Sequence, residues 1–374
     1  MTPSTPDSHR PPAGPHRAPG IVPPYLLEHI AEAEDPRFER ASIAARRSLV
    51  APRDYRAARE AVPGEPAPGR PGVIGERAVV GVAGRPDRRV SDAGGAFELP
   101  GELVRAEGAP PSDDVAVDEA YDGLGDTYAL FWAEFGRHSI DGLGLPLEAT
   151  VHYGRRYDNA FWDGERMVFG DGDGEVFERF TASLSVIGHE LAHGFTACTT
   201  PLVYQGQSGA LNEHVSDVFG ALVEQHAAGQ RAEEASWLIG EGLFTAEVEG
   251  RSLRSMIEPG TAYDDDVLGR DPQPGHLRDY IETRDDNGGV HLNSGIPNRA
   301  FALAALELGG AAWERAGRVW YDVMVGRTLA PNAGFAEFAA ATVRAAEQRF
   351  GAASPERRAV AAGWSAVGLE PPAR

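Results

Sequence analysis

The feature that most constrains this chain is the segment His189-Glu190-Leu191-Ala192-His193. Two histidines four positions apart share one face only if the segment is helical, and the apolar residues around it have helical spacing. Imidazole nitrogens are good Zn2+ ligands, and Glu190 would lie near such a metal while staying free to act as a base. Because short segments of this kind also arise by chance, the prediction of zinc depends on a third ligand.

A second segment of helical period supplies a candidate for the third ligand. The longer motif HExxHxxGxxH, in which a third histidine follows closely, is absent. Thr196 and Thr199 occupy the positions at which this motif needs a glycine and a histidine. Glu213 lies twenty residues after His193, and two antiparallel helices would face each other across a metal. Asp217, one turn further, could accept the N–H of a zinc-bound histidine. Each acid alone is more often an exposed helix residue, so the prediction depends on their joint placement.

Composition limits the partners. The 374 residues include 56 acidic and 35 basic side chains, and the net charge of -21 disfavours nucleic acid and anionic membranes. No apolar run is long enough for a membrane helix. The N-terminus lacks the apolar core of a secretory signal, so we expect a cytoplasmic protein or export by an unconventional route. The single cysteine, Cys198, excludes an intramolecular disulfide.

The order of patterns along the chain predicts an α+β protein. Residues 1–20 are proline-rich and expected to be disordered, 21–60 form a small module, and 61–72 form a Pro/Gly linker. Residues 73–200 are expected to form a mixed, β-rich N-terminal catalytic domain that includes the zinc helix. Residues 201–374 are expected to form a mainly α-helical C-terminal catalytic domain.

Five blocks of sequence resemble, in family order, the thermolysin family of zinc peptidases, and within it the protealysin-like branch. The blocks are DNAFWDGERMVFGDGDG, GHELAHG, VYQGQSGALNEHVSDVFG, LRSMIEPG and DDNGGVHLNSGIPNRAF, and they cover most of residues 113–330. The resemblance implies a thermolysin-like fold with the zinc site in the cleft between the two domains. It also implies a zinc-dependent endopeptidase in which His189, His193 and Glu213 bind one zinc ion and Glu190 is the general base and acid.

The resemblance assigns roles to three residues outside the zinc segment. It implies that His291 and Tyr204 donate hydrogen bonds to the developing oxyanion and that Asp286 orients His291. From the residues alone, each has a plainer interpretation. Tyr204 could be a packing residue at a helix start, His291 a loop histidine and Asp286 a turn acid.

The same resemblance implies contacts with a peptide substrate. Asn159 and Ala160 would lie on an exposed strand edge that binds the substrate backbone, and Arg254 would contact the carbonyl on the leaving-group side. An apolar pocket for the residue after the cut would predict cleavage before bulky hydrophobic residues. Its expected lining, which could equally be ordinary core packing, is Phe177, Val186 and Leu253.

A calcium site of the family has lost most of its acids here. Glu224 and Glu241 remain, whereas the other matching positions hold Ser185, Ser236, Leu238 and Gly242. Because calcium takes six to eight oxygen ligands, we expect this site to be degraded, although Ca2+ binding stays possible.

The segment Pro23-Pro24-Tyr25-Leu26-Leu27 resembles the short propeptide of protealysin-like enzymes. An extended, proline-rich segment could lie in the substrate cleft as an intramolecular inhibitor, so we expect a precursor that is cut between about residues 48 and 72. The alternative is a tail with no inhibitory role. Two other functions stay open: a catalytically silent binding protein of the same fold, and a zinc aminopeptidase, for which no GxMEN-type amine anchor is present.

Overall fold

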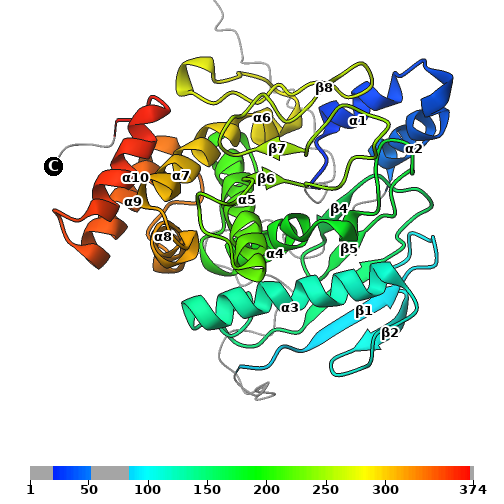
Figure 1. Ribbon diagram of the computed structural model, residues 1–374, viewed down its shortest axis with the longest axis horizontal. Coiled ribbons are helices and arrows are strands. Elements are labelled where there is room, and N and C mark those ends of the chain that lie inside the picture. The colour runs from blue at the N-terminus through cyan, green and yellow to red at the C-terminus, as the bar shows by residue number, and fades with distance from the viewer. Residues whose placement is uncertain (1–19, 52–83, 371–374) are drawn as a thin grey trace, which may run out of the picture.

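The computed structural model describes residues 20–51 and 84–370 (Figure 1). The predicted linker 61–72 and the predicted disordered segment 1–20, apart from Gly20, lie outside the described residues. Residues 52–60 and 73–83, which border the predicted linker on either side, also lie outside the described residues. The domain bounds therefore stay predictions.

A five-stranded sheet organises the first half of the described chain. Its strand order is β2-β1-β3-β5-β4, with β1 and β3 parallel, β3 and β5 parallel, and the outer pairs antiparallel. Strand β4 is thus an edge strand. The bounds are β1 Arg88–Asp92, β2 Glu102–Ala106, β3 Leu147–Val151, β4 Ala160–Trp162 and β5 Met167–Phe169.

Helix α3 (Val115–Phe135) packs along this sheet, with β1 as its neighbour in Figure 1. Its start is set by Asp114, whose carboxylate accepts the backbone N–H of Ala116 at 2.8 Å and so satisfies a donor that has no partner within the helix. Its end is set by Gly136, which adopts the left-handed conformation with φ of 63°.

The second half of the chain is mainly helical, and Figure 1 shows α8, α9 and α10 gathered at the end of the molecule away from the sheet. The expectation of an α+β protein with a β-containing N-terminal part and a helical C-terminal part is confirmed. Within the described ranges, no helix is long and apolar enough to cross a membrane.

The helices of the second half are α4 Leu184–Thr199, α5 Gly206–Ala228, α6 Asp286–Asn293, α7 Gly295–Leu308, α8 Ala316–Gly326, α9 Phe335–Phe350 and α10 Pro355–Ala366. Between α5 and α6 lie the short strands β6 Leu238–Ile239, β7 Arg254–Ser255, β8 Asp264–Asp265 and β9 Gly269–Arg270.

Helices α4 and α5 approach each other unusually closely because glycines face each other across their interface. A Cβ atom added to Gly188 would lie 3.0 Å from the Cα of Gly220. One added to Gly220 would lie 2.4 Å from the backbone oxygen of Ser185. This contact fixes the separation of the two helices that carry the predicted zinc ligands.

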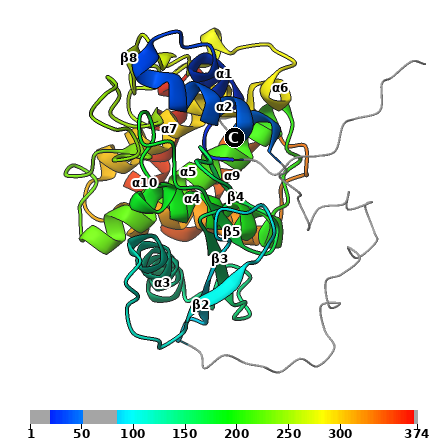
Figure 2. The same cartoon turned by 90° about the vertical axis from the view of Figure 1, so that its right-hand side faces the viewer.

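The N-terminal residues 20–51, here named the prosegment, form α1 (Pro24–Ala31) and α2 (Glu39–Val50). Figures 1 and 2 show these helices together on the side of the molecule that carries β8. Leu26, Leu27 and Ile30 of α1 are fully buried in the main core. Glu175 holds the start of α2, because its carboxylate pairs with Arg40 at 2.5 Å and accepts the N–H of Ala41 at 3.0 Å.

We predict that Gly220→Ala pushes α4 and α5 apart. Overpacking should lower the free energy of unfolding by about 1–3 kcal/mol, and zinc affinity should fall because the ligands sit on both helices. Chelator competition and denaturant unfolding measure the two effects. The matched control is Gly326→Ala at the end of α8, where no atom lies within 4 Å of an added Cβ. That change should stabilise by up to about 1 kcal/mol; equal behaviour of the two variants would refute the close-packing argument.

Candidate active site

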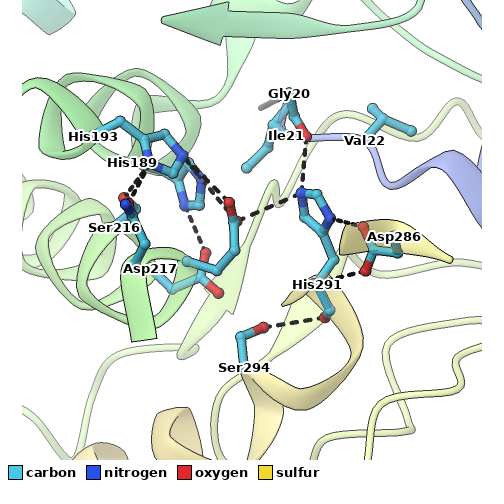
Figure 3. Close-up of polar contacts among 12 residues, drawn as sticks. Gly20, Ile21, Val22, His189, His193, Ser216, Asp217, Asp286, His291 and Ser294 are labelled. Carbon is cyan, nitrogen blue, oxygen red and sulfur yellow. Dashed lines mark hydrogen bonds and ion pairs between the residues drawn. The ribbon is translucent and has the colours of Figure 1, made fainter. Parts of the chain in front are cut away.

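The two histidines of α4 point their Nε2 atoms at one another, 3.1 Å apart (Figure 3). Asp217 accepts the Nδ1 hydrogen of His189 at 2.7 Å, and the Oδ1 atom of Asn212 accepts that of His193 at 2.9 Å. With Nδ1 protonated, each neutral ring keeps a lone pair on Nε2. Two lone pairs that face each other in a buried site are the donors that a shared cation requires.

Glu213 of α5 completes this donor set. Its carboxylate lies 3.4 Å from Nε2 of His189 and 3.5 Å from Nε2 of His193. The hydroxyl of Tyr204 donates to Oε1 of Glu213, whereas Oε2 is buried without a hydrogen-bond partner among the described residues. Two imidazoles and one carboxylate with a spare oxygen are the ligand set of a catalytic zinc site. The residues that are present therefore fit zinc.

Glu190 lies next to this donor set but is oriented by the edge of the sheet. Its Oε2 accepts the backbone N–H of Trp162 at the end of β4, at 2.9 Å. Its Oε1 is buried and unpartnered among the described residues. Burial raises the pKa of Glu190 to about 8. The sheet thus holds one carboxylate oxygen and leaves the other without a partner, on a residue that is grouped with His189 and His193.

Asp217 connects His189 to two further elements. Arg254 of β7 donates to Oδ1 of Asp217 from Nη2 at 2.8 Å and to Oδ2 from Nε at 3.0 Å, and Asn298 of α7 donates to Oδ2 at 2.8 Å. Burial by itself would raise the pKa of Asp217, but the charge of Arg254 and the bond from His189 hold it below its ordinary value. Asp217 is therefore an ionised acceptor, and the tautomer of His189 follows from it.

A chain of buried hydrogen bonds behind Asp217 was not predicted from the sequence. The indole N–H of Trp320 can only donate, and it donates to Nε2 of His214 at 2.7 Å. His214 must then carry its proton on Nδ1, which donates to Oδ1 of Asn298 at 2.8 Å, and this turns the Asn298 amide N–H toward Asp217. The position of His214 next to Glu213 was a signal in the sequence, but no local pattern marks Trp320.

His291 is held by an unusual turn. Residues Asp286, Asn287, Gly288 and Gly289 all have positive φ, a conformation that asparagine and glycine tolerate better than other residues. The turn directs the side chain of Asp286 toward His291. The Asp286 carboxylate accepts the backbone N–H of His291 at 2.8 Å and its Nδ1 hydrogen at 2.5 Å (Figure 3). Burial lowers the pKa of His291, but the charge of Asp286 outweighs it and the pKa is raised overall. The structure therefore brings the two residues together as the sequence predicted.

The first residues of the prosegment run through this site. The N–H of Ile21 donates to the carbonyl of Ala160 at 3.0 Å, and the amide of Asn159 exchanges two hydrogen bonds with the backbone of Val22. The predicted strand edge at Asn159 and Ala160 exists as the edge of β4, but it is not exposed. Both residues are fully buried, because the prosegment covers the edge.

Two more contacts hold this part of the prosegment. Arg254 donates from Nη1 to the carbonyl of Ile21 at 3.1 Å. Nε2 of His291 lies 3.2 Å from the carbonyl of Gly20 (Figure 3) and 3.4 Å from the hydroxyl of Tyr204. The side chain of Ile21 is fully buried in the main apolar core, to which the three residues predicted to line a pocket, Phe177, Val186 and Leu253, also belong.

Ser185 lies where the sequence analysis expected a calcium site of the family to be degraded, and its hydroxyl has a protein partner. The Ser185 hydroxyl accepts the N–H of Gly240 at 3.1 Å. Burial raises the pKa of Glu224, with Glu241 as a nearby like charge. These contacts satisfy Ser185 without a metal ion.

Comparison with known proteins decides the family. Residues 90–197 match the model of the thermolysin metallopeptidase catalytic domain, and residues 200–369 match that of the thermolysin metallopeptidase alpha-helical domain. The chain belongs to the thermolysin metallopeptidase family. It is a zinc-dependent endopeptidase synthesised as a precursor, as the sequence predicted.

Individual relatives agree with the family model. An extracellular metalloprotease of Pectobacterium carotovorum subsp. carotovorum is 56% identical over 77% of this chain and 82% of that protein. The protease PrtS of Photorhabdus sp. (strain Az29) is 50% identical over 76% of each chain. The structure resembles the precursor of protealysin, a metalloproteinase from Serratia proteamaculans, with a TM-score of 0.84, 48% identity, and coverage of 94% of this chain and 100% of that chain.

We predict that Asp217→Asn weakens zinc binding by about 10–100-fold, because the variant loses the anionic acceptor that fixes His189. The free energy of unfolding should fall by about 3–5 kcal/mol, because Arg254 stays buried without its counter-charge. Chelator competition and denaturant unfolding measure these effects. The control is Asp322→Asn, which breaks a partly exposed ion pair with Arg349. It should leave zinc affinity unchanged; a similar loss in both variants would contradict the assignment.

Proposed function

We propose that this enzyme hydrolyses internal peptide bonds with His189, His193 and Glu213 as the zinc ligands and Glu190 as the general base and acid. When bound, zinc polarises the scissile carbonyl and activates water near neutral pH. Glu190 takes a proton from the attacking water and passes it to the leaving nitrogen through Oε1, while Oε2 stays bonded to the backbone of Trp162. Asp217 keeps the Nδ1 proton on His189 and so keeps Nε2 available.

The observation that carries the proposal is the way in which a peptide already occupies the site. The prosegment pairs with the edge of β4 through Ala160 and Asn159, a mode of recognition by strand addition. His291 faces a peptide carbonyl oxygen with Nε2 while Nδ1 donates to Asp286, so both ring nitrogens act as donors. We assign His291 and Tyr204 to the developing oxyanion, and Asp286 to the orientation of His291.

We further propose that Arg254 binds the carbonyl of the residue after the cut and that Phe177, Val186 and Leu253 line its pocket. The full burial of Ile21, a bulky hydrophobic residue, in the same apolar core as these residues supports a preference for cleavage before bulky hydrophobic residues. The preference is moderate, because a missing methylene in such a pocket is worth only about 1–3 kcal/mol.

The binding of the prosegment in the site also favours an endopeptidase over the two alternatives, a zinc aminopeptidase and a catalytically silent binding protein. Gly20, whose carbonyl lies in the site, is not the first residue of the sequence, so its nitrogen is part of a peptide bond and binding uses no free α-amine there. An aminopeptidase would require a partner for that amine. A catalytically silent protein would have no use for an orphaned Glu190 oxygen on a residue that is grouped with His189 and His193, the two histidines that Glu213 also approaches.

We propose that residues 20–51 are the enzyme's own inhibitor and that calcium is not held at the Glu224 position. Substrates are therefore kept out until the prosegment leaves. Of the two locations predicted from the sequence, export is favoured by the name of the Pectobacterium relative, an extracellular metalloprotease.

Glu190→Gln should lower kcat for a blocked internal peptide by about 10²–10⁴-fold, because the amide cannot take a proton. Zinc content, measured by mass spectrometry of metals, should stay at one ion per chain. Glu165→Gln, an exposed acid in the turn before β5, serves as the control and should be fully active. Full activity of Glu190→Gln would remove this mechanism.

Leu27→Asp should release the prosegment early, because burying even a neutral polar group without a hydrogen-bond partner costs on the order of 2–7 kcal/mol. When zinc is added to the metal-free precursor, the lag before cleavage of an added peptide should shorten by about tenfold or more, the equivalent of at least 1.4 kcal/mol. Ile43→Asp on α2 is the control, since Ile43 is 43% exposed. An unchanged lag in Leu27→Asp would show that this helix does not restrain activity.

A further inference from the structure

The geometry points to the Gly20–Ile21 peptide bond as a bond that the enzyme hydrolyses in its own precursor. This inference rests on the proposed function, because it uses the roles assigned above. The prosegment would then be a substrate before it is an inhibitor. The cut lies apart from the maturation cut that was expected between about residues 48 and 72.

The register of the prosegment on β4 fixes which residue follows the cut. Ile21 donates its N–H to Ala160 and presents its carbonyl to Arg254, the group assigned to the leaving-group side. Val22, the next residue, exchanges both of its backbone hydrogen bonds with Asn159. Ile21 therefore holds the place of the first residue after a scissile bond.

The other side of the bond is fixed by His291. Its Nε2 lies 3.2 Å from the carbonyl oxygen of Gly20, and its Nδ1 donates to Asp286, so Nε2 is the atom left to donate to that oxygen. The antiparallel bridge between Gly20 and Phe161 gives the segment the direction that places this carbonyl first and the Ile21 nitrogen second. The bond between the oxyanion donor and the leaving-group contacts is therefore Gly20–Ile21.

The two side chains suit this position. A Cβ atom on residue 20 would lie 2.8 Å from Oδ1 of Asn159, so glycine permits the close approach to β4. Ile21 is a bulky hydrophobic residue and is fully buried. Glycine before the bond and isoleucine after it match the site on both sides.

The reaction balances with water as the only co-reactant. The oxygen of water bonds to the carbonyl carbon of Gly20, and the bond from that carbon to the Ile21 nitrogen breaks. One proton passes through Glu190 to the nitrogen, which leaves as an amine and becomes an ammonium at neutral pH, while Gly20 ends as a carboxylate.

The shortened prosegment stays docked after this cut. Its remaining contacts include the Asn159 and Arg254 bonds, the buried face of α1 and the Arg40–Glu175 pair. Trimming at Gly20–Ile21 therefore leaves the enzyme inhibited, and activity toward added peptides requires the separate loss of residues 21–51.

The test follows the full-length chain after purification in chelator. Zinc is added, samples are stopped with chelator, and intact mass, N-terminal sequencing and cleavage of a blocked internal peptide are recorded together. A chain that starts Ile-Val-Pro-Pro-Tyr should accumulate before the added peptide is cut. Its rate should not depend on protein concentration over a 100-fold dilution, because the bond already lies in its own site.

Variants separate the outcomes. Ile21→Asp should slow this cut by about 100-fold or more, because the pocket is apolar, whereas Ile21→Leu and the exposed control Ile43→Asp should keep it. Glu190→Gln should not be cut, and a cut in that chain would assign the product to a contaminant and overturn the inference. If the wild type cleaves the added peptide while Gly20–Ile21 stays intact, the inference fails and the proposed function stands. If it cleaves neither, both fail.

Discussion

The buried carboxylate of Asp217 is the interaction on which the rest of the site depends. It accepts the proton of His189 on α4, pairs with Arg254 on β7 and accepts the amide of Asn298 on α7. Three elements from distant parts of the chain are thus joined at one negative charge. Because Arg254 also binds the carbonyl of Ile21, a single side chain links Asp217, the partner of the candidate metal ligand His189, to the prosegment.

The edge of β4 holds the prosegment and, under the proposed function, is also the surface that binds a substrate. An edge strand presents unpaired backbone groups, which is a hazard for a sheet left bare. Here the prosegment covers those groups through Ala160 and Asn159 until it is removed. Under the proposed function, inhibition requires no separate surface, because the proposed substrate-binding groups also hold the prosegment. The buried face of α1 adds apolar contact that a short peptide lacks.

The sequence predicted best those features that depend on residues close together in the chain. The spacing of His189 and His193 predicted one helix face, and α4 provides it with both Nε2 atoms 3.1 Å apart. The helical part of the chain and its β-containing first half were also predicted, because periodicity follows burial. The edge at Asn159 and Ala160 was expected to be exposed, and this was wrong for the precursor because no pattern in residues 157–162 reveals that residues 20–22 cover it.

The sequence by itself determined the donor types, their helical spacing and the family blocks that carry them, because these depend on neighbours a few residues away. Only the tertiary structure decided how far apart α4 and α5 lie, since that depends on Gly188 meeting Gly220 across 32 positions. It alone decided the hydrogen-bond chain from Trp320 to Asp217, and the register that sets Gly20–Ile21 against His291 and Arg254. These features are contacts between segments far apart in the chain, and such contacts leave no periodic trace in the sequence.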